Sequence, residues 1–181
     1  MSFNERALLV QLNISQWTAR ALDKKATQQV ADANSTTTAA GRYNKMLLPS
    51  NEYLMAVHKK TTVIRTDYYE NTLPWGMEGT QLLPSRNYFE FLELFKSHKA
   101  DWELMVETFL HNYGSLRNQA RGFLAGLYND KDYPSADEVR RKFKMDLAIF
   151  PVPSNDFRVL LNDNEVQRIQ QDVERRVNDA A

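Results

Sequence analysis

A run of five residues, Arg140–Lys144, carries four positive charges and suits a nucleic-acid site. The cations can neutralise phosphates, and Phe143 among them offers a ring on which a base can stack. A structural interpretation competes with this one. In it Val139 and Phe143 point inward, and the cations are the solvated side of a short helix, whose carboxyl end favours positive charge. We favour the structural interpretation and keep the nucleic-acid site as the alternative. Its candidate residues are Arg140, Arg141, Lys142 and Lys144.

The histidines and the absence of cysteine give no pattern of metal ligands. His58, His98 and His111 are the only histidines, and none has a second histidine or a paired acid at the spacing of a helical motif such as H-E-x-x-H. Without cysteine the chain has no disulfide, no thiolate nucleophile and no cysteine-rich zinc or iron–sulfur site. We therefore expect no metal and no cofactor.

Two acidic residues, Asp146 and Asp156, stand out by their apolar surroundings. We expect Asp146 on the outer face of a strand. Asp156 with Arg158 is interpreted as an ion pair that holds a proline-rich turn, in preference to a catalytic dyad. The chain has six glycines and shows no Gly-rich phosphate loop, G-x-S-x-G motif or dinucleotide fingerprint. These observations favour a protein that is not an enzyme.

Composition places the chain among intracellular globular proteins. Its 181 residues are most simply read as one domain, 1–181, and the 23 basic and 23 acidic residues cancel. There is no overall field to attract nucleic acid or an anionic membrane, so such a site has to be local. The apolar run Ala7–Val10 is too short for a signal peptide or a membrane span. We expect a cytoplasmic protein that does not enter membranes.

Two helical stripes dominate the pattern of apolar residues. One runs from Ser85 to Tyr128, with apolar residues at steps of three and four, and predicts one long helix or two in series. Lys99 interrupts this stripe, so we expect a kink or a helix break within 97–101. A second stripe predicts a helix that ends near Asn71, before Pro74. The link between them is short, so the two helices are expected to form a long antiparallel hairpin.

Shorter segments are expected to surround this hairpin. Predicted strands are Ala7–Ile14, Thr80–Leu83, Met145–Phe150 and Phe157–Leu161, of which the first and the last two are expected to form a small sheet. Ser15 is expected to cap a mostly polar helix ending near Ala33, followed by a polar loop over 34–40. Ser135 and Glu138 form the pattern of a capping box, which predicts a short helix to about Lys142.

The chain ends in a predicted helix, 163–181, that is suited to association. Asn162 and Glu165 have the spacing of a cap, and the helix reaches Ala181 without a stop signal. Such an ending indicates either a docking helix or a piece cut from a longer chain, and a homo-oligomer is one way to cover its apolar stripe. The candidate interface residues are Val166, Ile169, Val173 and Val177.

Several short motifs, spread from Leu8 to about Leu161, together resemble a family encoded by tailed bacteriophages and prophages and classed as a domain of unknown function. They are LLVQLNISQW at 8–17, Arg42-Tyr43, Leu73-Pro74-Trp75, Tyr133-Pro134-Ser135, Pro151-Val152-Pro153 and Asp156-Phe157-Arg158. The residues that mark the resemblance most clearly are Trp17, Trp75, Tyr133, Pro134, Asp156, Phe157 and Arg158. Members of that family often accompany a MoxR-type AAA+ ATPase and a von Willebrand-type metal-adhesion protein, and they tend to be longer than this chain.

The resemblance implies an adaptor or substrate-side role in the cytoplasm of a host cell. Together with the helical stripes it leads us to expect a mainly helical α+β fold, with a long hairpin, a small β-sheet and a C-terminal association helix. The expected function is a non-enzymatic interaction protein that binds an AAA+ ATPase or a host factor. An inhibitor of a bacterial defence complex fits the same features, and a nucleic-acid-binding protein that uses Arg140–Lys144 is the alternative.

Overall fold

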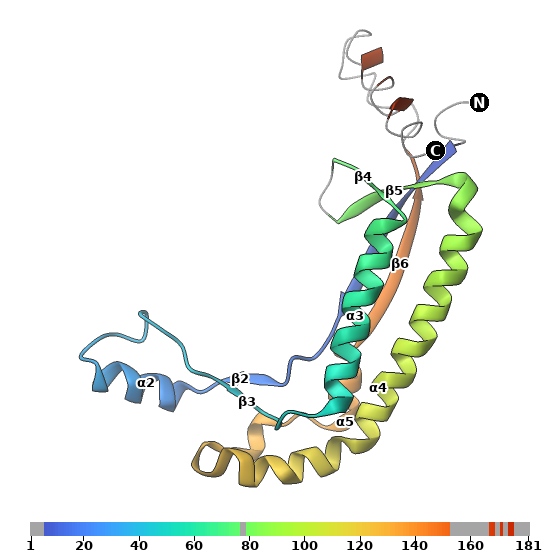
Figure 1. Ribbon diagram of the computed structural model, residues 1–181. Coiled ribbons are helices and arrows are strands. Elements are labelled where there is room, and N and C mark those ends of the chain that lie inside the picture. The colour runs from blue at the N-terminus through green and yellow to red at the C-terminus, as the bar shows by residue number, and fades with distance from the viewer. Residues whose placement is uncertain (1–5, 77–78, 153–166, 169–170, 172–173, 176–181) are drawn as a thin grey trace. The chain divides into compact units, whose positions relative to one another are not determined.

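The structure, a computed structural model, describes residues 6–76, 79–152, 167–168, 171 and 174–175 (Figure 1). It has an α+β fold in which helix dominates, with a four-stranded antiparallel sheet and a long helix. This confirms the predicted fold class. The predicted strand Phe157–Leu161, the ion pair Asp156–Arg158 and the four interface valine and isoleucine positions of the last helix lie outside the described residues. The hairpin as a whole and the association helix therefore stay predictions.

Two compact units divide the chain. Unit 1 comprises Met1–Ile14, Lys59–Trp102 and Lys144–Ala181, and unit 2 comprises Ser15–His58 and Glu103–Phe143. The two longest helices among the described residues, α3 (Glu52–Glu70) and α4 (Tyr88–Leu124), each contribute residues to both units.

The four-stranded sheet of unit 1 has the order β4-β5-β1-β6, and its strands are β4 (Leu73–Pro74), β5 (Thr80–Pro84), β1 (Ala7–Ser15) and β6 (Lys144–Pro151). β5 pairs antiparallel with β1, from Ala7 opposite Pro84 to Gln11 opposite Thr80. The predicted strands in β1, β5 and β6 are confirmed, and so is the pairing of the first strand with β6. Pro74 lies in the edge strand β4, where the lack of an N–H costs no ladder bond.

β1 contributes buried residues to two clusters on its opposite faces, which explains why it reads as a nearly continuous apolar run. Ala7 and Leu9 pack in one buried cluster, against which Trp75 also packs. Val10 faces the other way, in a cluster with Tyr68 of α3 and Phe91 of α4. The Tyr68 hydroxyl donates to the Val10 carbonyl at 2.8 Å, so the one polar atom that this ring brings into the core is satisfied.

Within unit 1, polar side chains of α4 meet partners on α3 at the place where we expected a kink or break. α4 is continuous α-helix through 97–101, so the predicted break is wrong. His98 Nε2 lies 2.6 Å from Asp67 Oδ2, and Asp101 accepts from Lys60 at 2.7 Å. His98 and Asp101, which flank Lys99, are thus paired across the two helices and give no reason to break the helix there.

The region after β1 differs from the prediction of a helix capped by Ser15. Residues 16–19 are not helical, Arg20–Leu22 form β2, and the helix α2 covers only Lys24–Ala33. Asp23 is the N-cap, and its carboxylate accepts from the Ala26 N–H at 2.9 Å. The Ser15 hydroxyl instead donates to the Lys142 carbonyl at 3.1 Å. An aspartate cap next to Lys24 therefore prevailed over the serine cap. The predicted helix end at Ala33 and the polar loop after it are confirmed.

The rest of unit 2 has a short two-stranded ribbon, a short helix and a buried aromatic cluster. β2 pairs antiparallel with β3 (Asn44–Met46), and the capping box of Ser135 and Glu138 starts α5 (Ala136–Arg140) as predicted. In the cluster, the centroid of the Trp17 ring lies 6.2 Å from that of Phe109. The fully or almost fully buried residues of this unit include Leu47, Val57, Phe109, Ala120 and Val139. In the described part of the chain no helix is long and apolar enough to cross a membrane.

Candidate functional site

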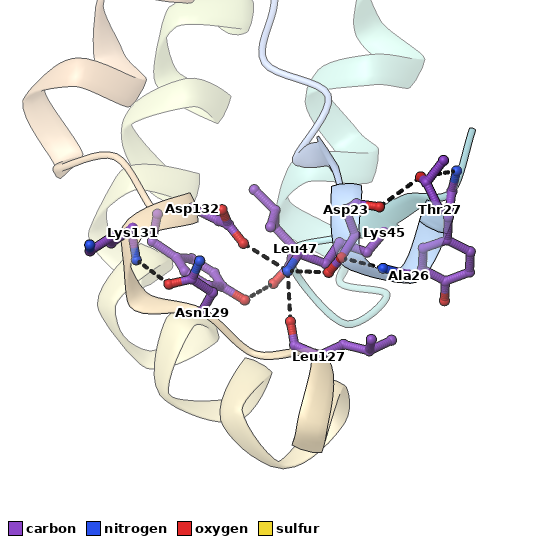
Figure 2. Close-up of polar contacts among 11 residues, drawn as sticks. Asp23, Ala26, Thr27, Lys45, Leu47, Leu127, Asn129, Lys131 and Asp132 are labelled. Carbon is purple, nitrogen blue, oxygen red and sulfur yellow. Dashed lines mark hydrogen bonds and ion pairs between the residues drawn. The ribbon is translucent and has the colours of Figure 1, made fainter. Parts of the chain in front are cut away.

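The β2–α2–β3 segment, Arg20–Met46, is held in place by a lysine that is almost completely buried. Lys45 Nζ lies 2.9 Å from Asp23 Oδ2, 2.8 Å from Asp132 Oδ2 and 2.7 Å from the Leu127 carbonyl oxygen (Figure 2). The Lys45 side chain is 4% exposed, and the two carboxylate side chains are 13% and 23% exposed. The three donors of the ammonium thus have three acceptors, which is the condition under which a buried cation is tolerated.

The charge states of this network follow from its contacts. Burial alone lowers the pKa of Lys45, but hydrogen bonds and charge attraction from Asp132 and Asp23 outweigh it, so the pKa is raised. The pKa of Asp23 is lowered, first by the hydrogen bond from the Ala26 N–H and then by Lys45. Lys45 is therefore a cation and Asp23 an anion over the whole physiological range. We interpret the network as a structural clamp rather than as an acid–base site.

The clamp joins the ribbon to the region after α4. Asp23 and Lys45 belong to the β2–α2–β3 segment, whereas Leu127 and Asp132 follow α4 in the chain. Tyr133 adds a second tie, because its hydroxyl donates to the Leu47 carbonyl at 2.6 Å. A two-stranded ribbon with strands of three residues is marginal alone, so these ties fix its position.

The ribbon has one buried and one exposed face, as its register shows. Ala21 lies opposite Lys45, on the face that meets the clamp. The pairs on either side of it, Arg20 with Met46 and Leu22 with Asn44, occupy the opposite face because side chains alternate along a strand. All four of these residues are exposed, Leu22 by 42% and Met46 by 49%. We call Arg20, Leu22, Asn44 and Met46 the ribbon face.

A groove lies beside the ribbon, between α2 and the loop that follows it. It has a volume of about 360 Å³ and is lined in part by Val30 and Ala31 of α2 and by Arg42 and Tyr43 after the loop. Val30 is 54% and Tyr43 41% exposed. The segment Arg20–Met46 thus presents four large exposed apolar side chains, Leu22, Val30, Tyr43 and Met46.

The basic run Arg140–Lys144 agrees with the structural interpretation of its apolar residues. Val139 is completely buried and Phe143 is 8% exposed, so the Phe143 ring is not open for stacking on a base. Arg140 Nη1 lies 2.7 Å from Glu107 Oε1, and Arg141, Lys142 and Lys144 are exposed. Binding of phosphates by the exposed cations stays a prediction.

The other residues singled out in the sequence have packing roles where the structure describes them. Trp17 and Tyr133 are buried, and Trp75 is partly buried against a cluster of unit 1. The Pro134 carbonyl accepts from the Tyr113 hydroxyl at 2.8 Å. Asp156, Phe157 and Arg158 lie outside the described residues.

The histidines do not come together. His98 pairs with Asp67, and His58 Nε2 lies 3.1 Å from the Trp17 carbonyl oxygen, whereas His111 is exposed. Within the ranges that the structure describes, no three histidine or acidic side chains gather in a way that holds a metal ion. Asp146 lies on the exposed side of β6, as predicted.

Sequence reasoning missed the clamp and the ribbon face. Aspartate is among the residues preferred at a helix N-cap, and this preference could have located Asp23 before the helix that starts at Lys24. Lys45 gives no such signal, because its side chain looks like any surface lysine and two of its partners are far along the chain. Comparisons with known proteins add no candidate, since no family model, curated protein or solved structure matches this chain.

Proposed function

We propose that the chain is a non-enzymatic interaction protein that binds a protein partner through the segment Arg20–Met46. The observation that carries the proposal is the two-sided ribbon. One face is tied to the protein by the buried Lys45, and the ribbon face presents Leu22 and Met46 to solvent. Apolar side chains that a fold holds rigidly at the surface are typical of interaction sites, because binding then costs little ordering entropy.

The two long helices serve as the scaffold in this proposal. Their paired contacts, such as the Trp102 Nε1 donation to Thr61 Oγ1 at 2.9 Å, support a helical hairpin that carries the interaction segment. A last helix with Val166, Ile169, Val173 and Val177 on one stripe would offer a second contact or self-association. The resemblance to the phage family adds a partner class, a MoxR-type AAA+ ATPase or a host factor, with the chain acting as an adaptor or as an inhibitor.

Capture of the partner tests this proposal. The tagged full chain is used as bait in extracts of uninfected and phage-infected bacterial cells, half of each treated with nuclease, and captured proteins are identified by mass spectrometry. A variant with Leu22→Asp and Met46→Asp breaks the ribbon face. Leu104→Asp is the matched control, because Leu104 is 69% exposed in the same unit but lies on α4.

We expect one protein that resists nuclease, is retained by the control and is lost from the double variant. A partner bound equally by the double variant would contradict the proposal. The alternative function, nucleic-acid binding by Arg140–Lys144, rests on the exposed Arg141 and Lys142. Capture that disappears with nuclease and in an Arg141→Glu, Lys142→Glu variant would favour that alternative.

A further inference from the structure

The groove beside α2 is formed by backbone and side chains that are fixed at both of its ends. Near the start of α2, the Thr27 hydroxyl donates to the Asp23 carbonyl at 2.7 Å and accepts from the Tyr43 N–H at 3.0 Å. The Asp23 N–H in turn donates to the Tyr43 carbonyl at 2.9 Å. Through Asp23 this end of the groove is connected to the Lys45 clamp.

The other end is fixed where the loop leaves α2. The Thr36 N–H donates to the Ala31 carbonyl at 2.9 Å, and the Asn34 side chain donates to the Val30 carbonyl at 2.8 Å. These bonds satisfy carbonyls that a helix end leaves unpaired. The groove is therefore present in the free protein and does not need a ligand to form it, which reduces the entropy cost of binding.

The lining of the groove combines apolar surface with a single charge. Val30 and Tyr43 provide large, partly exposed apolar side chains, and Thr36 and Thr37 provide hydroxyls. Arg42 is the only charged residue among those that line it, and its side chain is exposed. No other described residue pairs with the Arg42 guanidinium. The Arg42 guanidinium can therefore form bidentate hydrogen bonds with a carboxylate.

The segment around the groove has a charge of its own. Counted together with Asp132, which pairs with the buried Lys45, the segment Arg20–Met46 has five basic and three acidic residues, a net charge of +2, in a chain whose total is zero. Its exposed cations include Lys24 and Lys25 at the start of α2. The field around the groove therefore favours an acidic partner and steers it during encounter.

We propose that this groove binds an acidic peptide segment of a protein partner, with one carboxylate on Arg42 and a neighbouring apolar side chain against Val30 and Tyr43. The inference rests on the proposed function and specifies its partner chemistry. A nucleic acid fits the groove less well, because one cation between apolar walls does not follow a row of phosphates. The threonine hydroxyls offer hydrogen bonds to a peptide backbone.

Peptide selection tests the inference with a defined probe. The immobilised full chain is used to select from a phage-displayed library of random peptides of about twelve residues, a length that spans a recognition groove. Peptides that also bind the support without the protein are removed. Selected peptides are synthesised, and their affinities for the full chain and its variants are measured by fluorescence anisotropy.

We expect the selected sequences to combine Asp or Glu with a large apolar residue. Their affinity should fall at least about tenfold in Arg42→Glu, equivalent to about 1.4 kcal/mol, and in Val30→Asp. Arg65→Glu, an exposed charge reversal on α3, should leave the affinity unchanged. Circular dichroism checks that each variant is folded, and amide NMR shifts on peptide addition should concentrate at Thr36–Tyr43.

Three results would overturn the inference: no enriched peptide, enriched peptides without acidic residues, or equal affinity for wild type and Arg42→Glu. Binding of a single-stranded oligothymidine that is lost in Arg42→Glu would also overturn it, in favour of a nucleic-acid site. Its failure is distinguishable from failure of the proposed function. A cellular partner that is lost from the ribbon-face variant but kept by Arg42→Glu supports the proposed function and refutes peptide binding in the groove. Acidic peptides that bind the groove when no cellular partner is captured support the groove and refute the proposed function.

Discussion

Replacing Lys45 by Met should release the ribbon and lower the free energy of unfolding. The methionine keeps most of the packing of the lysine stem, so the change mainly removes the ammonium group. That group has acceptors at 2.9, 2.8 and 2.7 Å on Asp23, Asp132 and the Leu127 carbonyl. Breaking a buried ion pair by removing one partner typically costs about 3–5 kcal/mol. Because the two carboxylates are 13% and 23% exposed and regain some water, we expect roughly 2–4 kcal/mol.

Urea unfolding followed by circular dichroism measures this loss, and amide hydrogen exchange at Asp23 and Leu47, whose N–H groups donate to the Tyr43 and Ala19 carbonyls, locates it. Lys59→Met is the matched control, because Lys59 is exposed on α3, and it should change the free energy of unfolding by less than about 0.5 kcal/mol. Equal unfolding free energies for Lys45→Met and Lys59→Met, with unchanged exchange in the ribbon, would refute the clamp.

Three further predictions concern the clamp and buried side chains elsewhere in the fold. The pKa of Lys45 is raised and that of Asp23 is lowered, so the clamp contributes stability between pH 3.8 and pH 10.5, the ordinary pKa values of the two groups. Ribbon amides should therefore lose exchange protection as pH rises above 10.5 or falls below 3.8. Protection that is constant through both limits would contradict this. Burial raises the pKa of Tyr68 to about 12, and also that of Tyr133, so ultraviolet titration should show two tyrosines that ionise near pH 12, each absent from its Phe variant. Trp102→Phe should cost about 1–3 kcal/mol in chemical unfolding, because it leaves the buried Thr61 hydroxyl without the Nε1 donor, and a loss below about 0.5 kcal/mol would show that the contact is not formed.

The elements with long, regular patterns were predictable from the sequence. α3 and α4 follow from apolar steps of three and four, and α5 from the reciprocal pattern of Ser135 and Glu138. β1 and β6 follow from short apolar runs, the second of them closed by Pro151. In each case the signal is local, and it spans enough residues to outweigh a single misplaced side chain.

The ribbon was not predictable in the same way. β2 and β3 have three residues each, which is too short for an alternation to be recognised. Ser15 and Asp23 are both acceptable caps, and only the burial of Trp17 and Ala19, the latter with a φ of +52°, excludes a helix between them. Such competition is decided by tertiary packing, which a single sequence does not display.

The candidate site itself depends on distant partners. Lys45 meets Asp132 only because the region after α4 returns to the ribbon, and no spacing rule connects these two positions. Arg42 and Tyr43 drew notice only as part of a family resemblance, not for the groove that they line. The basic run Arg140–Lys144 was conspicuous in the sequence, yet its aromatic residue is buried.

We propose that partners bind through Arg20–Met46. Hydrogen–deuterium exchange of the full chain, alone and with its captured partner, tests this binding site. The largest gain in protection should fall within Arg20–Met46, including the peptides that contain Leu22 and Tyr43. Protection confined to α4 or to Arg140–Lys144, with unchanged exchange in Arg20–Met46, would contradict it.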